Sequence, residues 1–228
     1  MFFSGISEND SSIETEGDEV VVFSGKRWSL IHEEVFCDFV ERRTLLAWGM
    51  NDDIGKVLID EEVIVRRLDK LAEKILKDFE GEEILVVGIM KGALVFMADL
   101  CRRLPVPLQI ETLNVASYHG GRESSGVVEF LDAKLPEVEG QGVLLIDDIL
   151  DTGRTLKAVK DRLFEMGAAK VGTAVLLSKE KERAEEVKAD YVGFEIGDEF
   201  VVGYGLDYQG RYRNLPFVGV LKEEVYAQ

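Results

Sequence analysis

Three carboxylates and a hydroxyl-rich turn stand close together in the segment IDDILDTGRT, residues 146–155. Asp147 and Asp148 end an apolar run, and Asp151 follows shortly after them. Adjacent carboxylates can accept hydrogen bonds from a vicinal diol such as a ribose, or hold a cation through water. The segment therefore predicts a site for a sugar or for a hard cation.

The residues after the carboxylates are typical of a phosphate-binding turn. Thr152 and Thr155 carry hydroxyl groups, Gly153 allows a tight turn, and the free N–H groups of a following helix would bind a phosphate monoester. The spacing excludes a GxxxxGK[ST] phosphate loop. In the alternative interpretation the carboxylates only cap the helix. That interpretation leaves three acids beside a phosphate-type turn unexplained.

A second candidate loop is GIMKG, residues 88–92, where Lys91 supplies a cation between two glycines. Alone it is more typical of an ordinary turn, but its place after a neighbouring strand favours binding of a diphosphate. No GxGxxG segment is present, so the dinucleotide fingerprint is absent. His32 and His119 have no metal partners at a ligand spacing, and we interpret both as ordinary surface or loop residues.

The charge of the chain limits its partners. Its 228 residues include 44 acidic and 27 basic side chains, for a formal net charge of −17. Such a field repels nucleic acid and anionic membranes. An anionic ligand must then be held locally by backbone N–H groups, by a few cations or through a metal. Cys37 and Cys101 lack CxxC spacing, and no secretory signal is present, so we expect a cytoplasmic protein.

The elements that must position these loops follow from hydrophobic periodicity. Apolar residues at helical spacing predict a helix over 60–79, and further helices are expected over 92–104 and 155–166. Apolar runs predict strands over 84–89, 108–116, 127–131, 142–146 and 171–177. Buried strands that alternate with helices indicate an α/β fold with a mainly parallel, twisted sheet flanked by helices. Ligands bind such sheets at the carboxyl ends of the strands.

The chain is expected to hold one domain with an appendage. Residues 1–52 show no convincing period, and we expect a poorly ordered N-terminal extension there, with a small helical subdomain over 30–47 as the alternative. Residues 53–228 form the main domain. The stretch 117–126 is rich in glycine and serine and is expected to be a mobile loop.

Taken together, the motifs resemble those of the type I phosphoribosyltransferases, and among them the hypoxanthine-guanine phosphoribosyltransferases. The likeness runs over about residues 53–220. It is carried, in the family's order, by MKG (90–92), SYHGG (117–121), IDDILDTGRT (146–155), SKE (178–180) and VGFEIGDEFVVGYGLDY (192–208). It implies a phosphoribosyltransferase-like domain with a small hood built from the terminal segments.

The resemblance also implies an activity in purine salvage. This is the Mg²⁺-dependent transfer of the phosphoribosyl group of 5-phosphoribosyl 1-diphosphate to N9 of hypoxanthine or guanine, giving IMP or GMP and diphosphate. By the same resemblance, the ribose and 5′-phosphate site consists of Asp147, Asp148, Asp151, Thr152, Gly153, Arg154 and Thr155. Asp151 would act near purine N7 as the catalytic general acid or base.

The remaining roles are implied in the same way. Lys91, Gly92 and Arg213 would bind the diphosphate, in a turn that the family often builds with a non-proline cis peptide. Lys179 would donate to the purine O6, Phe200 would stack on the ring, and the Val201 backbone would read the purine edge. Asp207 would hold Mg²⁺, with Asp147 and Asp148 contributing indirectly. Ser117 and Tyr118 would begin the flexible loop.

The chain departs from the family pattern in two places, within the site and at the N-terminus. Asp147 and Arg154, in the ribose and phosphate site, stand where many members carry Glu and Lys. The segment MNDDIGKVLIDEEVI, residues 50–64, is similar to the start of bacterial members. We therefore expect residues 1–49 to be either a genuine extension or an upstream stretch included through a wrong start site.

Two rival functions remain open. One is a phosphoribosyltransferase for xanthine, adenine or a pyrimidine, although Asp151 and Lys179 together favour a 6-oxopurine. The other is a weakly catalytic or non-catalytic regulator that binds nucleotides and RNA on the same scaffold. The net charge opposes RNA binding, and such regulators tend to lack the acid at position 151. We expect small-molecule substrates, no nucleic-acid or membrane partner, and a homo-oligomer, either a dimer or a tetramer.

Overall fold

A computed structural model describes residues 13–16, 19–24, 27–32, 52–117, 128–181, 184–185 and 187–227. The chain divides into two compact units, Met1–Asp53 and Ile54–Gln228. Each unit is treated by itself below. None of the helices in the described ranges is long and apolar enough to cross a membrane.

The first unit contains a three-stranded antiparallel sheet of β1 (Ile13–Glu16), β2 (Glu19–Ser24) and β3 (Arg27–His32). No regular element is expected here from the sequence, and these strands correct that expectation for the residues that they cover. β2 and β3 are rich in β-branched and aromatic residues, and a Gly-Lys pair separates them, which is typical of a hairpin. The alternative expectation is a small helical subdomain over 30–47. Residues 33–47 of that segment lie outside the described residues. The disorder expected of residues 1–52 as a whole stays a prediction.

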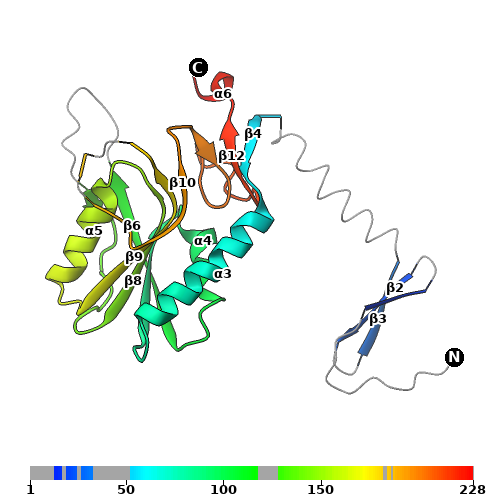
Figure 1. Ribbon diagram of the computed structural model, residues 1–228, viewed down its shortest axis with the longest axis horizontal. Helices are drawn as coiled ribbons and strands as arrows, with labels where there is room; N and C mark the ends of the chain where they lie inside the picture. The colour runs from blue at the N-terminus through cyan, green and yellow to red at the C-terminus, as the bar shows by residue number, and fades with distance from the viewer. Residues whose placement is uncertain are drawn as a thin grey trace. The chain divides into compact units, whose positions relative to one another are not determined.

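The second unit is built on a six-stranded sheet in the order β10-β9-β8-β5-β6-β7 (Figure 1). All neighbours pair in parallel except β6 and β7. The strands are β5 (Ile84–Met90), β6 (Leu108–Ser117), β7 (Val128–Phe130), β8 (Gly142–Leu150), β9 (Lys170–Lys179) and β10 (Tyr191–Ile196). This confirms the predicted fold class.

Helices cover both faces of this sheet (Figure 1). α3 (Glu61–Asp78) and α4 (Leu94–Cys101) pack on one face, and α5 (Arg154–Glu165) packs on the other. The central strands alternate between two cores: Leu144 and Ile146 of β8 face α3 and α4, whereas Val143 and Leu145 face α5. Burial on both faces explains why the central strands are continuous apolar runs rather than alternating ones.

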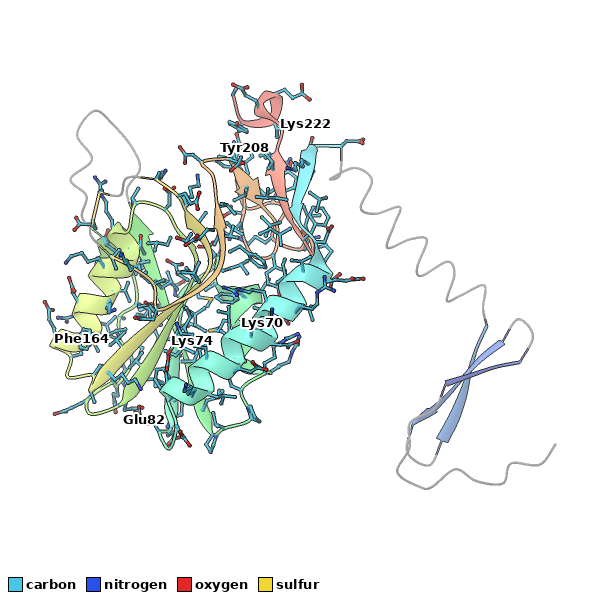
Figure 2. All side chains as sticks on the ribbon, viewed as in Figure 1. Lys70, Lys74, Glu82, Phe164, Tyr208 and Lys222 are labelled. Atoms are coloured by element: carbon cyan, nitrogen blue, oxygen red, sulfur yellow. The ribbon has the colours of Figure 1, made fainter. Side chains whose placement is uncertain are left out.

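A small second sheet forms the hood that the family resemblance implies. It has the order β11-β12-β4, with β4 (Ile54–Ile59) from the start of the unit and β11 (Val201–Val202) and β12 (Val218–Leu221) from its end. α6 (Glu223–Tyr226) follows β12. Figure 2 labels Tyr208 and Lys222 in this region, and it labels the exposed Lys70 and Lys74 on α3.

The predicted helices and strands of the main domain are confirmed in type, with shifted ends. α4 is shorter than the predicted helix over 92–104, because residues 91–93 and 102–103 form turns. β8 is longer than predicted and runs to Leu150, so Asp147 and Asp148 lie inside the strand rather than after it. The extension follows from pairing, since β9 continues beside β8 up to Ser178.

Candidate active site

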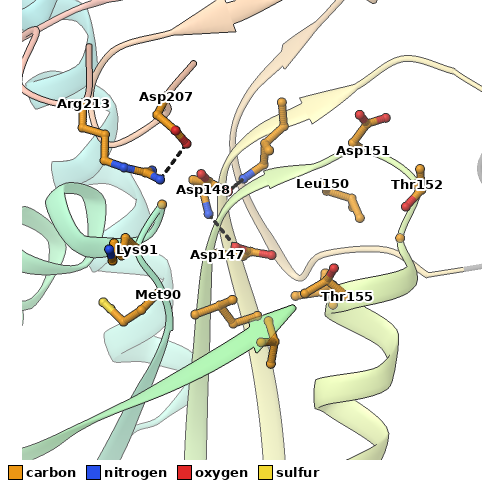
Figure 3. A pocket seen from close by; sticks show the side chains of 16 residues that line it. Met90, Lys91, Asp147, Asp148, Leu150, Asp151, Thr152, Thr155, Asp207 and Arg213 are labelled. Atoms are coloured by element: carbon orange, nitrogen blue, oxygen red, sulfur yellow. Dashed lines mark hydrogen bonds and ion pairs between the residues drawn. The ribbon is translucent and has the colours of Figure 1, made fainter. Parts of the chain in front are cut away.

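A cavity of about 520 Å³ opens at the carboxyl edge of the sheet (Figure 3). It is lined by the ends of β5 and β8, by the loop before α5, and by two residues that follow the hood strand β11. Of the predicted site residues, the lining includes Lys91, Gly92, Asp147, Asp148, Asp151, Thr152, Gly153, Thr155, Asp207 and Arg213. The structure therefore gathers, around one cavity, residues that are far apart in the sequence.

Asp147 and Asp148 form the acidic floor of the cavity. Asp147 is buried, and the backbone N–H of Asp148 donates to its Oδ1 at 3.0 Å. The N–H of Ile149 donates to Asp148 Oδ1 at 2.7 Å. Burial, and then the negative charge of Asp148, raise the pKa of Asp147 well above its ordinary value. Burial also raises the pKa of Asp148, against a smaller lowering by the Ile149 N–H and by Arg213. Two acids held this way favour a cationic or hydroxyl-donating ligand.

The turn after β5 brings backbone close to the second of these acids. The Met90–Lys91 peptide bond is cis, as the family resemblance implies. A Cβ placed on Gly92 would lie 1.8 Å from Asp148 Oδ2. Only glycine therefore allows this turn and the carboxylate to occupy their places together, and the resulting gap between them is part of the cavity.

The loop between β8 and α5 has the geometry of a phosphate site. Gly153 precedes the helix with φ of +82°, a left-handed conformation that glycine adopts without strain. Arg154 begins α5, and its N–H donates to Thr152 Oγ1 at 3.5 Å. The first turn of α5 carries no acidic residue. The N–H groups of this turn and the hydroxyls of Thr152 and Thr155 are therefore groups that can bind an anion at the helix start.

Asp207 and Arg213 line the opposite side of the cavity. Arg213 Nη2 lies 2.6 Å from Asp207 Oδ1, and Arg213 Nη1 donates to the carbonyl of Gly205 at 2.6 Å (Figure 3). The N–H of Gly210 donates to Asp207 Oδ2 at 2.6 Å. Both side chains are fixed by these contacts, so the cavity has an oriented cation and an oriented carboxylate on this side.

Lys179 stands at the end of β9, near but not in the cavity lining. Its Nζ is 3.0 Å from Asp198 Oδ1 and 3.9 Å from Asp151 Oδ2. Lys181 approaches the same two acids, with its Nζ 2.5 Å from Asp151 Oδ1 and 3.0 Å from Asp198 Oδ1. Sequence reasoning missed Lys181 and Asp198, because Lys181 lies in a run of charged residues after β9 and Asp198 is one of two adjacent acids after β10.

Phe200 and Val201 lie in the hood and do not line the cavity. The Phe200 ring stacks on Tyr226 of α6 with centroids 4.9 Å apart, and it meets Tyr208 edge-on at 5.7 Å. Phe200 remains 38% exposed, so part of the ring is open to a ligand. Val201 pairs with Val220 in the hood sheet. Tyr226 was also missed, because a lone aromatic near the chain end gives no pattern.

Three predicted parts of the site are still to be placed: Arg154, Ser117, and the loop that contains Tyr118. Arg154 does not line the cavity, although its backbone begins the phosphate-type helix. Ser117 ends β6 opposite Val128, at the base of the expected loop. Tyr118 and the rest of that loop, including His119, lie outside the described residues, as does Cys37.

The carboxylates around the cavity can be compared with the ligands that Mg²⁺ prefers in proteins. Within the described ranges, no three His, Cys, Asp or Glu side chains come together as a metal-binding cluster. Mg²⁺, however, commonly takes only one or two carboxylates and fills its shell with water and substrate phosphate oxygens. Asp147 and Asp148 fit that role, because they are adjacent carboxylates at the floor of the cavity, where water and substrate oxygens would complete the shell of the ion.

Paired acids, a glycine turn and a helix N-terminus at the carboxyl edge of a hooded parallel sheet are the arrangement of a type I phosphoribosyltransferase. Residues 58–209 match the phosphoribosyl transferase domain family. The hypoxanthine-guanine phosphoribosyltransferase of Streptococcus pneumoniae R6 is 45% identical over 178 residues, covering 78% of this chain and 99% of that protein. The Lactococcus lactis protein of the same name is 45% identical over 182 residues, covering 80% and 99%.

A solved structure agrees with the relatives. The hypoxanthine phosphoribosyltransferase of Staphylococcus aureus is 43% identical, with a TM-score of 0.75, and the match covers 79% of this chain and 98% of that one. The chain belongs to the phosphoribosyltransferase family, in the group of the hypoxanthine-guanine phosphoribosyltransferases.

Proposed function

We propose that this chain transfers the phosphoribosyl group of 5-phosphoribosyl 1-diphosphate to N9 of hypoxanthine or guanine, and so serves purine salvage. The observation that carries the proposal is the cavity itself, where the buried Asp147 and the half-buried Asp148 lie between the start of α5 and a turn that carries a lysine. A ribose with a 5′-phosphate and a diphosphate on C1 matches this arrangement. The 5′-phosphate would meet the start of α5, the ribose hydroxyls the paired acids, and the diphosphate the turn with the lysine. The family and its named members support the same activity.

In the proposed mechanism each part of the cavity has one task. The 5′-phosphate binds to the N–H groups at the start of α5 and to the hydroxyls of Thr152 and Thr155. Asp147 and Asp148 accept hydrogen bonds from the ribose hydroxyls. The diphosphate meets Lys91 and the guanidinium of Arg213. These contacts hold the C1 atom of the sugar in place for attack.

The chemical step forms one bond and breaks one. N9 of the purine bonds to C1 while the bond from C1 to the diphosphate oxygen breaks, and diphosphate leaves. The purine loses a proton, which the Asp151 carboxylate takes at N7. A positioned acid or base of this kind contributes about 10²- to 10⁴-fold in rate. The loop that begins at Ser117 would exclude water, since hydrolysis competes with transfer.

Magnesium completes the proposed site. Asp207, with Asp147 and Asp148 indirectly, would hold Mg²⁺ together with the oxygens of the substrate. The ion supplies charge neutralisation for the diphosphate as it leaves. In a chain of net charge −17, such an ion is the simplest way to bring a highly anionic substrate to an acidic cavity.

The specificity for a 6-oxopurine is proposed on the position of Lys179. An exocyclic oxo group at C6 accepts a hydrogen bond from an ammonium group, whereas an amino group at C6 offers the lysine no acceptor. Lys179 lies beside Asp151, so one purine ring could reach both groups through O6 and N7. Phe200 would stack on the ring, and the backbone of Val201 would contact its edge.

A spectrophotometric assay with 5-phosphoribosyl 1-diphosphate, Mg²⁺ and one base at a time tests the proposal. We expect turnover with hypoxanthine or guanine and little with adenine or uracil. Turnover with adenine or a pyrimidine alone would instead support the rival substrate. Absence of turnover with every base, together with RNA binding at low salt, would support the regulator.

We further expect a cytoplasmic homo-oligomer, which gel filtration of the full chain would show as a dimer or tetramer.

A further inference from the structure

The two acids and two lysines beside the cavity form a closed group of four charges. Asp151 and Asp198 each contact both Lys179 and Lys181, at the distances given above. The group is electrically balanced, with two positive and two negative charges. The shortest of the four contacts joins Lys181 to Asp151, so Lys181 rather than Lys179 is the main partner of the proposed catalytic base.

The backbone holds Lys181 in this place. Its own N–H donates to the Lys179 carbonyl at 3.1 Å, and the N–H of Glu180 donates to the Ile196 carbonyl of β10 at 2.8 Å. Further along the same loop, the N–H of Glu185 donates to the carbonyl of Thr152 at 3.3 Å. The loop that carries Lys181 is thus tied both to the sheet and to the phosphate-type loop that carries Asp151.

The electrostatics point the same way. Asp151 Oδ1 is shielded from solvent, and Lys181 Nζ is the cation beside it. An ionised oxygen in such a place needs a nearby positive charge. The contact with Asp151, followed by that with Asp198, raises the pKa of Lys181, and Lys181 is the first cause that lowers the pKa of Asp198.

We propose that Lys181 is a positioning residue: it holds the Asp151 carboxylate in place for the purine, and it keeps Asp198 paired when Lys179 turns to the purine O6. This inference rests on the proposed function, because it assumes that Asp151 takes a proton from the purine. It assigns to Lys179 and Lys181 different tasks. Lys179 contacts the substrate, and Lys181 acts on the reaction only through Asp151.

The test measures kcat, both KM values and the melting temperature for full-length Lys181→Met and Lys181→Arg. Lys157→Met is the matched control, because Lys157 pairs with Asp161 at the same 2.5 Å on the exposed side of α5. We expect Lys181→Met to lower kcat about 10- to 100-fold, as for loss of a hydrogen bond to a charged group. The KM for 5-phosphoribosyl 1-diphosphate should stay within about twofold, Lys181→Arg should recover most of kcat, and the control should match wild type.

A double variant separates positioning from a general structural role. If Lys181 acts through Asp151, then Lys181→Met should slow Asp151→Asn by less than about twofold, because the two changes remove one function. Independent, multiplying effects would overturn the proposal, as would a Lys181→Met variant with wild-type kcat. A fall in kcat matched by a lower melting temperature in both Lys181 variants would also overturn it. A wild-type chain without turnover removes the proposed function, and this inference with it.

Discussion

Gly92 offers a sharp test of the cavity, because its missing side chain makes room for Asp148. In Gly92→Ala the new Cβ would lie 1.8 Å from Asp148 Oδ2, whereas real Cβ atoms stay at least 3.0 Å from such neighbours. The two groups must therefore separate by about 1.2 Å, the difference between these distances. Asp148 Oδ1 accepts from the Ile149 N–H at 2.7 Å, so a shift of the carboxylate by this much breaks that hydrogen bond.

A lost hydrogen bond to a charged group corresponds to about 1.5–3 kcal/mol, or roughly 10- to 100-fold in affinity. We therefore expect Gly92→Ala to raise the KM for 5-phosphoribosyl 1-diphosphate by that factor and to change the KM for the purine little. Gly55→Ala is the control, because its Cβ would meet its nearest neighbour at an ordinary 3.4 Å. Steady-state kinetics with each substrate varied in turn measure both effects. A KM for 5-phosphoribosyl 1-diphosphate within twofold of wild type, or a rise confined to the purine, would refute the reasoning.

Three further predictions concern the same loop and floor. Asp151→Asn should lower kcat by about 10²- to 10⁴-fold and change binding of 5-phosphoribosyl 1-diphosphate less; equal losses in both, measured by kinetics and calorimetry, would argue against its role. Asp147→Asn should raise the melting temperature of the ligand-free chain. Because the pKa of Asp147 is raised in the folded chain, the folded state loses stability as the pH rises above the ordinary aspartate value of about 3.9. An asparagine at this position does not ionise and so avoids that loss. A lower melting temperature of the variant at pH 7–8 would contradict this reasoning. Gly140→Ala should cost about 1–2 kcal/mol in thermal unfolding, since Gly140 has positive φ with open space around it, and Gly153→Ala should cost more, because its Cβ would also lie 2.6 Å from Val187 Cγ1. Only Gly153→Ala should also raise the KM for 5-phosphoribosyl 1-diphosphate; equal KM values would exclude a phosphate-binding loop.

Most helices and strands of the main domain could be predicted because they leave a local pattern, whereas β4, β10, β11, β12 and α6 were not predicted. The helical spacing from Val63 to Phe79 and the apolar run of β5 need no partner to be recognised. The ends of β8 could not be predicted, because only pairing with β9 carries that strand through its two acids. The strands of the N-terminal unit were missed for a similar reason, since short hairpin strands with mixed polarity give no clear period.

The candidate site was predictable where one segment carries several groups. IDDILDTGRT places its acids and hydroxyls within ten residues, and the rule for parallel sheets puts them beside the turn after β5. Asp207 and Arg213 needed the family resemblance, since nothing in their local sequence indicates that the hood brings them to the cavity. Lys181 needed the structure, because only the fold brings it to Asp151.

The most direct test of the central claim is a ³¹P NMR measurement on the full chain with 5-phosphoribosyl 1-diphosphate, Mg²⁺ and hypoxanthine. If the cavity performs phosphoribosyl transfer, the substrate signals should be replaced by those of IMP and diphosphate in equal amounts, and only when the base is present. Diphosphate released without IMP, or unchanged substrate after prolonged incubation, would contradict the account.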